Sequence, residues 1–247
     1  MRIIFFTTST LSDVQEVSSR CVRHFFPGCE HIVIDGRGKW FGVWYEWLDI
    51  AKDMQADWFV HLDEDCFIVA QDRILETMEL MRRQNHDIAG CPDGYNEYRS
   101  GNHMALNSFF MILNRKCIDA WHQRDHVPQF KKEWIREYPF VKKGQTNHVY
   151  DMEFGSSGKP VGKIYVPGTE PYYDFFWVLK EAGLSFLYLE PAFGAEFQTT
   201  NLLDDSVIHM WYQRWRNQER VVGLMHTMPN KQRFDGMIRK IQFLLEP

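Results

Sequence analysis

The chain has 247 residues, 45 % of them hydrophobic, and a formal net charge of −5. This length and apolar content suit one large α/β domain with an ordinary core, and the negative balance gives no reason to expect a nucleic acid partner. No apolar run approaches the roughly 20 residues that a membrane-spanning helix needs.

Cysteine usage and the N-terminus bear on the cellular compartment. The sequence has five cysteines, an odd count without metal-ligand spacing: Cys21, Cys29, Cys66, Cys91 and Cys117. This pattern favours reduced thiols in a cytoplasmic protein. The apolar run at residues 3–6 is too short for a signal peptide. We expect a cytoplasmic location, with peripheral association at the inner face of a membrane as an alternative.

Two short apolar strands are predicted near the N-terminus, at residues 3–6 and 31–34, with a helix over residues 14–26 between them. The first strand leads into a hydroxyl-rich loop that contains Thr7, Thr8, Ser9 and Thr10. The second strand ends at Asp35. Ligands of open α/β sheets bind beyond the carboxyl ends of the strands, so both loops are candidate ligand contacts. The alternative is ordinary loop chemistry, a hydroxyl cap for the helix and a turn aspartate.

Two cations precede the next predicted helix, which runs from about Trp40 to Gln55. Arg37 and Lys39 lie in a glycine-containing turn at the start of this helix. Cations at that position could meet a diphosphate. They could equally be solvated loop charges, which is the commoner arrangement.

The most informative stretch is an apolar segment, residues 58–62, that runs directly into Asp63, Glu64 and Asp65. Clustered carboxylates at the end of a buried strand are costly unless a positive group lies nearby. Residues i and i+2 of an extended chain point to the same side, so Asp63 and Asp65 are predicted to converge, with Glu64 turned away. Two hard oxygen ligands at one point suit Mg²⁺ or Mn²⁺. The alternative is a solvated acidic turn, or a pair of caps for the helix that follows.

The remainder of the chain is predicted to contain strands and helices on either side of an irregular segment. The expected strands are 87–91, 104–113, 185–189 and 205–211, and the expected helices are 71–85, 115–123, 175–182 and 231–245. Residues 124–168 break any long element and are expected to form an irregular flap. A second acidic pair, Asp151 and Glu153, lacks a preceding apolar strand and is a weaker metal candidate.

The apolar strand that ends in Asp63 and Asp65 resembles the Asp-x-Asp segment of nucleotide-sugar glycosyltransferases of the GT-A fold, of the family 2 type. The resemblance covers roughly residues 1–210 in the order of elements. It implies a Rossmann-like α/β/α sandwich with a mainly parallel central sheet, in one catalytic domain. Within residues 1–247, a nucleotide-sugar half, an acceptor-side half and a C-terminal helical extension would occupy 1–115, 116–210 and 211–247.

The resemblance also implies roles for particular residues. Asp63, Asp65 and a late histidine, His209, would hold Mn²⁺ or Mg²⁺ on the diphosphate of the donor. The donor would be contacted by polar groups at the strand ends and in the sugar pocket: Thr7, Thr8, Ser9, Asp35, Arg37, Lys39, Glu64, Asn107 and Ser108. The last two interrupt an apolar strand and could instead make internal hydrogen bonds. A lone histidine is likewise more often structural than a ligand.

Inverting members of this family carry an acidic general base at the start of a helix in the second half of the chain. The matching position reads Tyr173-Asp174, where the family often has Glu-Asp. Asp174 is the candidate base, Glu170 is its rival, and a retaining enzyme without such a base stays open. Asp174 could also simply cap the helix, for which aspartate is well suited.

These expectations describe a metal-dependent hexosyltransferase that moves a sugar from a UDP- or GDP-sugar donor to a hydroxyl of a glycan or glycoconjugate. Inversion of the sugar carbon follows if Asp174 is the base. One alternative is a metal-dependent nucleotidyltransferase or phosphohydrolase, although residues 7–12 contain none of the glycines that would cradle phosphates. Another is a non-catalytic carbohydrate-binding module that uses the aromatic residues.

Overall fold

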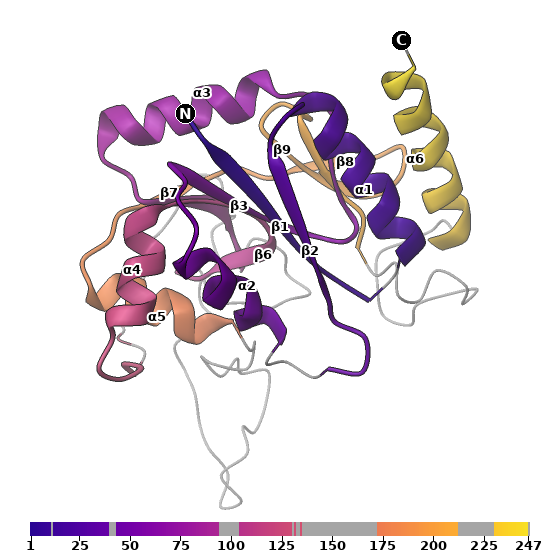
Figure 1. Cartoon of the computed structure of the whole chain (residues 1–247). Coiled ribbons are helices and arrows are strands. Elements are labelled where there is room, and N and C mark those ends of the chain that lie inside the picture. The colour runs from indigo at the N-terminus through magenta and orange to yellow at the C-terminus, as the bar shows by residue number, and fades with distance from the viewer. Residues whose placement is uncertain are drawn as a thin grey trace, which may run out of the picture.

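The computed structural model describes residues 1–10, 12–39, 43–93, 104–129, 131, 134, 172–211 and 230–246. Within them, two β-sheets are flanked by helices (Figure 1). None of the helices in this part of the chain has the length and apolar character of a membrane span. Glu170, Asp151 and Glu153 lie outside the described residues, as does most of the predicted flap.

A six-stranded sheet forms the centre of the molecule. Its strands, in spatial order, are β2 (Glu30–Asp35), β1 (Ile3–Ser9), β3 (Trp58–Asp63), β6 (Leu106–Asn114), β5 (Ile88–Pro92) and β7 (Phe186–Tyr188). β1 is parallel to both neighbours and β5 is parallel to β7, whereas β6 is antiparallel to both strands beside it. The predicted α/β fold with a mainly parallel central sheet is therefore confirmed.

Helices cover both faces of this sheet because its central strands are apolar on both sides. They are α1 (Ser12–Phe25), α2 (Val43–Lys52), α3 (Asp72–Gln84), α4 (Arg115–Gln123) and α5 (Tyr173–Glu181). Alternate residues of β1 show the division: Ile4 and Phe6 pack with α2, α4 and α5, whereas Ile3 and Phe5 pack with α3 and the end of α1. Figure 1 shows α2, α4 and α5 grouped below the sheet and α3 above it.

A second sheet of four antiparallel strands adjoins the first. Its strands, in spatial order, are β4 (Cys66–Ile68), β10 (Val207–His209), β9 (Thr199–Leu202) and β8 (Ala192–Gly194). The C-terminal helix α6 (Asn230–Leu245) lies beside α1 and packs on this sheet through a buried cluster that includes Phe67, Ile208 and Met237 (Figure 1). The amphipathic pattern of the C-terminal segment therefore reflects packing on the domain.

Several element ends differ from the sequence-based expectation. The last predicted strand, 205–211, is reduced to β10, because Leu203, Asp204 and Asp205 form a left-handed turn with φ of 55°, 51° and 64°. The described part of the second helix begins at Val43, since residues 40–42 lie outside the described residues. The division of the chain at residues 115 and 210 stays a prediction.

Candidate active site

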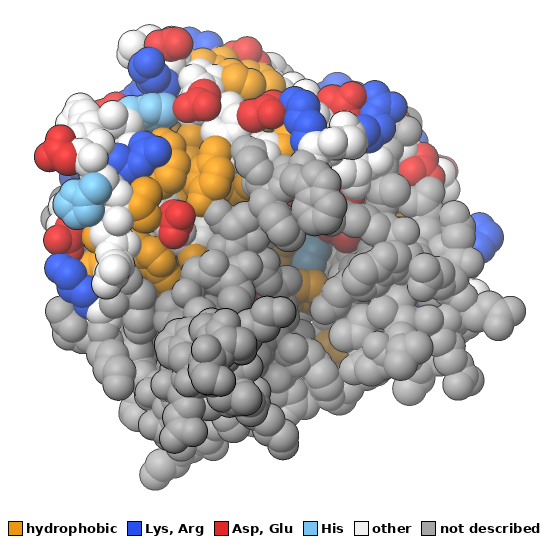
Figure 2. Space-filling model, turned by 90° about the horizontal axis from the view of Figure 1, so that it is seen from below, with side chains coloured by type: hydrophobic (Ala, Val, Ile, Leu, Met, Phe, Trp, Pro, Cys, Tyr) orange, Lys and Arg blue, Asp and Glu red, His pale blue; other side chains and the backbone are white. Residues whose placement is uncertain are grey.

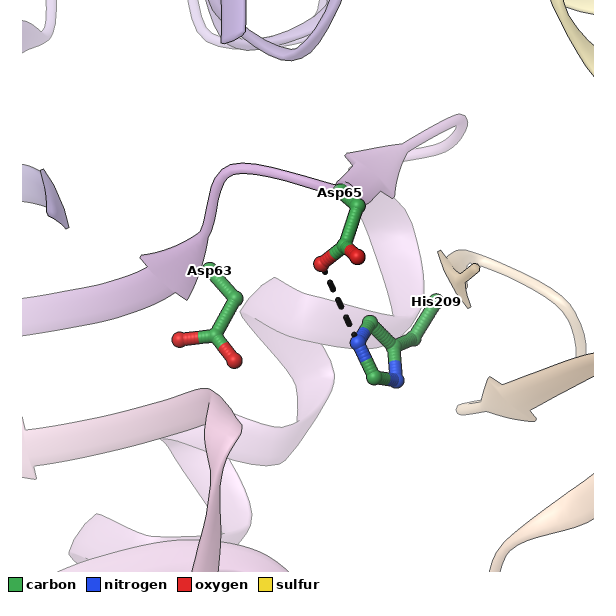
Figure 3. Close-up of side chains that lie close together, drawn as sticks. All are labelled: Asp63, Asp65 and His209. Atoms are coloured by element: carbon green, nitrogen blue, oxygen red, sulfur yellow. Dashed lines mark ion pairs between the residues drawn. The ribbon is translucent and has the colours of Figure 1, made fainter. Parts of the chain in front are cut away.

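Three side chains converge where the two sheets meet: Asp63, Asp65 and His209 (Figure 3). Each offers one ligand atom, and these atoms all lie within 4.8 Å of one another. β3 ends at Asp63 and β4 begins at Cys66, so the acidic turn connects the large sheet to the small one. β10 pairs with β4 in a register that sets His209 opposite Cys66, and this brings the imidazole beside Asp65.

Aromatic neighbours fix the orientation of the His209 imidazole. It stacks on the Phe109 ring, with the ring centroids 4.3 Å apart and 4° between the planes, and its centroid lies 4.4 Å from that of Trp211. Its Nε2 lies 3.2 Å from Oδ1 of Asp65, whereas its buried Nδ1 has no hydrogen-bond partner among the described residues. The nitrogen on the Asp65 side is thus placed as a ligand atom.

The three residues fit a divalent cation. Two carboxylates supply hard oxygen ligands, and their mutual repulsion is relieved by a dication. The imidazole nitrogen adds a ligand that suits transition metals, so the mixed set is compatible with Mn²⁺ as well as Mg²⁺. Asp63 is half-buried and His209 is buried, so part of the cluster is accessible to a ligand from solvent.

A cation near this cluster, Arg233 in α6, was missed by the sequence analysis. Its side chain is fully buried, with Nε donating to the carbonyl of Phe197 at 2.8 Å and Nη2 to that of Gln198 at 2.7 Å. Burial lowers the pKa of Arg233 to about 10, and the charge of Asp65 acts in the opposite direction. The sequence contained a signal for this burial. Met237 and Ile241, which are buried, follow Arg233 by four and eight residues, so the three side chains lie on the same face of the helix.

Glu64 is turned away from the cluster, as the alternation of side chains predicts. It is buried, and its carboxylate accepts hydrogen bonds from Ser9 Oγ at 3.0 Å, from Thr10 Oγ1 at 3.1 Å and from the backbone N–H of Thr10. The structure therefore places Glu64 in contact with the loop after β1. Its expected role as a direct donor contact stays a prediction.

The prediction that the first strand ends at residue 6 is wrong: Thr7, Thr8 and Ser9 are the last residues of β1, because each of them pairs with a residue of β2. Thr8 pairs with Asp63 and with Ile34 in the sheet register. The Oγ1 of Thr7 lies 3.0 Å from Nε2 of His31, whereas the buried Oγ1 of Thr8 has no hydrogen-bond partner in the part of the chain that the structure describes. The sheet thus brings the predicted nucleotide loop and the acidic turn side by side.

The charged residues after β2 are paired with one another or with α2. Arg37 donates to Asp35 through its backbone N–H and its guanidinium, at 2.7–3.0 Å. These hydrogen bonds hold the pKa of the exposed Asp35 carboxyl well below its usual range. Lys39 forms an exposed ion pair with Glu46 at 2.7 Å. Exposed pairs of this kind are weak, so a diphosphate could compete for either cation.

The polar residues at the start of β6 make internal hydrogen bonds. The Nδ2 of Asn107 donates to the buried carboxylate of Asp93, and its Oδ1 accepts from the backbone N–H of Phe109 at 3.2 Å. The backbone carbonyl of Ser108 accepts from Nδ1 of His61 at 2.8 Å. The hydroxyl of Tyr173 also donates to Asp93, so β6 and the start of α5 are connected through this carboxylate.

Asp174 lies in the first turn of α5, on the α2 and α4 side of the sheet. Burial raises its pKa, and the nearby Arg124 opposes that shift. The three-residue metal cluster does not include it. α5 is nonetheless linked to the end of β3, because the ring of Trp44 contacts those of Tyr172 and His61 at centroid distances of 5.5 Å and 5.7 Å.

Figure 2 views the molecule from below, turned by 90° from the view of Figure 1. A histidine and acidic side chains are visible near the middle of this face, set back from its outline. Hydrophobic side chains gather on one side of the same face. Polar groups and apolar surface therefore occur together on this side of the molecule.

No family model matches the chain, and no curated protein matches it. Among solved structures, A197 from STIV has 16 % identity over 92 % of this chain and 100 % of its own, with a TM-score of 0.43. A glycosyltransferase involved in the glycosylation of the major capsid of PBCV-1 has 11 % identity over 52 % and 68 %, with a TM-score of 0.38. Mannosyltransferase PcManGT from Pyrobaculum calidifontis, in complex with GDP-Man and Mn²⁺, has 10 % identity over 51 % and 47 %, with a TM-score of 0.37. At TM-scores of 0.43 and lower, none of these likenesses says what this chain binds or catalyses.

Proposed function

We propose that the chain is a metal-dependent glycosyltransferase that moves a hexose from a UDP- or GDP-sugar to a hydroxyl of a glycan or glycoconjugate. One observation carries the proposal: Asp63 at the end of β3, Asp65 in the turn after it and His209 at the end of β10 bring a ligand atom each within 4.8 Å of one another. A divalent cation there, Mn²⁺ or Mg²⁺, would neutralise and orient the diphosphate of the donor as it leaves.

The residues around these three side chains would contact the other parts of the donor. The carboxyl end of β1, with Thr7, Thr8 and Ser9, would bind the nucleoside, because it lies beside Asp63. Arg37 and Lys39 would contact the diphosphate after exchanging their exposed carboxylate partners for it. Asn107 would act on the sugar pocket through the hydrogen bonds that fix β6.

Proton removal from the acceptor hydroxyl is assigned to Asp174 in this proposal. A raised pKa, caused by burial, makes its carboxylate a better proton acceptor than an ordinary aspartate. A single displacement assisted by this base would invert the sugar carbon. Glu170 is the rival base, and a cytoplasmic location is part of the proposal because no disulfide joins the five cysteines, all of which lie in the described residues.

Titration of UDP and GDP with and without Mn²⁺ tests the proposal. We expect affinity that depends on Mn²⁺ in the wild-type chain and that is lost in Asp65→Ala. Asp53→Ala is the matched control, since it removes an exposed aspartate from the end of α2. A nucleotidyltransferase or phosphohydrolase would release nucleoside monophosphate or phosphate rather than transfer sugar. A carbohydrate-binding module would show no Mn²⁺-dependent nucleotide affinity.

A further inference from the structure

The middle residue of the acidic turn differs from its two neighbours in what it contacts. Glu64 is 4 % exposed, and every hydrogen bond described for its carboxylate above comes from Ser9 or Thr10. Ser9 is the last residue of β1 and Thr10 is the first residue after it, and the two together are called the Ser9–Thr10 loop. The Glu64 side chain therefore joins this loop to the turn that carries Asp63 and Asp65.

The sheet register explains why the two segments meet. β1 and β3 are parallel neighbours in which Thr8 pairs with Asp63, so the next residues of the two strands, Ser9 and Glu64, lie side by side at the carboxyl edge, where Ser9 still pairs with Asp35 of β2. The loop after β2 joins them, because the N–H of Gly36 donates to the carbonyl of Ser9 at 2.7 Å. A Cβ at residue 36 would lie 3.2 Å from that oxygen and 3.3 Å from the methyl group of Thr10, so the packing is tight.

The chemistry of Glu64 links this contact to the cation. A buried carboxylate between two others adds to the repulsion within the turn, and a bound dication relieves it. The backbone of Glu64 is flanked by two cation ligands, while its side chain fixes the Thr10 N–H and the Ser9 hydroxyl. A shift of the turn on cation binding would therefore move the Ser9 and Thr10 groups through the Glu64 side chain, and a shift of those groups would move the turn.

We propose that Glu64 is a positioning residue that couples cation binding at Asp63 and Asp65 to nucleoside diphosphate binding at the Ser9–Thr10 loop. The inference rests on the proposed function, since it takes this loop as the nucleoside contact. Glu64 sets the distance between the cation and the loop, and hence the fit of a ligand that must reach both. Without the Glu64 side chain both sites remain, but a bound cation raises the affinity for the nucleotide less than in the wild-type chain, and a bound nucleotide raises the affinity for the cation less.

Two variants of the whole chain separate this role from simple charge. Glu64→Ala removes the hydrogen bonds to the loop. Glu64→Gln is the matched control, because its Oε1 can accept from the Thr10 N–H and the Ser9 hydroxyl while its Nε2 donates to the Thr10 hydroxyl oxygen. Both variants remove the same negative charge, so any purely electrostatic effect on Mn²⁺ binding is equal in the two.

The readout is the factor by which Mn²⁺ raises affinity for UDP and for GDP. We expect Glu64→Ala to reduce this factor by roughly tenfold and Glu64→Gln to keep most of it. Affinity for Mn²⁺ alone should be equal in the two variants. Amide hydrogen exchange at Thr10 should be faster in Glu64→Ala than in the wild-type chain and in Glu64→Gln.

The possible failures are distinguishable. An unchanged Mn²⁺ factor in Glu64→Ala, with wild-type nucleotide binding intact, overturns the coupling role and leaves the proposed function standing. An equal loss in Glu64→Gln overturns it too, because charge alone would then explain the effect. A wild-type chain that binds Mn²⁺ but neither nucleotide overturns the proposed function, and the coupling with it.

Discussion

Nε2 of His209 lies 3.2 Å from Oδ1 of Asp65, which is in the turn between β3 and β4, whereas His209 ends β10 of the small sheet. Stacking of the imidazole on Phe109 holds this nitrogen on the Asp65 side. Packing within the protein therefore brings these two candidate ligand atoms together, so changes at His209 and at nearby charges should alter cation affinity.

His209→Ala should weaken Mn²⁺ binding by at least the roughly tenfold that loss of an outer-sphere partner typically costs. In the wild-type chain the affinity should fall as the pH is lowered, because a protonated imidazole cannot bind a metal. The variant should show a flatter pH dependence in the same titration. Identical titrations of the two proteins would return His209 to a structural role.

Arg233→Met should change stability and cation affinity in opposite directions. Loss of the guanidinium leaves two backbone carbonyls, of Phe197 and Gln198, without these donors, which should cost about 2 kcal/mol of unfolding free energy. The same change removes a positive charge that acts on Asp65, so Mn²⁺ should bind more tightly.

Arg233→Lys is the control for this experiment, because it keeps the charge while losing the forked geometry. Chemical denaturation and Mn²⁺ titration measure the two effects separately. Weaker Mn²⁺ binding in a folded Arg233→Met protein would contradict the electrostatic argument.

Asp174→Asn keeps the shape of the side chain but cannot accept a proton. If Asp174 is the base, nucleotide binding should persist while the rate of sugar transfer falls by roughly 10²-fold or more. The product anomer, read by NMR, should be inverted in the wild-type reaction. Glu170→Gln is the control for the rival base. A retained configuration would remove the base role from both residues.

His61 should make the fold less stable in acid. It is fully buried, and burial lowers its pKa from 6.5 to about 4, against the opposing effect of its hydrogen bond to Ser108. Between these values the unfolded chain takes up a proton that the folded chain does not, so unfolding free energy falls as pH falls. Titration of His61 should lower the unfolding free energy by roughly 3 kcal/mol between pH 6.5 and pH 4.

His61→Asn can still donate to the Ser108 carbonyl, so it tests the titration with little change in packing. Denaturant unfolding between pH 6.5 and 4 should show a shallower loss of stability in the variant. His31 contributes a slope of the same sign in both proteins, because burial also lowers its pKa to about 4. Equal slopes in the two proteins would rule out a part for His61.

The sequence was most informative where one short segment determines the outcome. The apolar run before Asp63 predicted the central strand, and Asp63 converges with Asp65 as predicted although residues 64 and 65 form a turn and not an extended strand. β8 and β9 were not predicted, since residues such as Thr199 and Asn201 give no apolar run and these strands form through pairing with each other and with β10. The hydrogen bonds of Glu64 and Asn107, and the burial of Arg233, depend on partners far away in the chain.

The acidic turn connects β3 of one sheet to β4 of the other, and His209 ends a strand of the second sheet. A cation bound by Asp63 and His209 together would act as a cross-link between the two sheets. Cation binding would then be measurable by amide hydrogen exchange. The amides of β9 and β10 should exchange more slowly with Mn²⁺ present, while the exchange rates of those in β1 and β2 change little. A cation that serves the proposed sugar transfer would thereby also stabilise the small sheet, with β8, β9 and β10, against local opening relative to the large sheet.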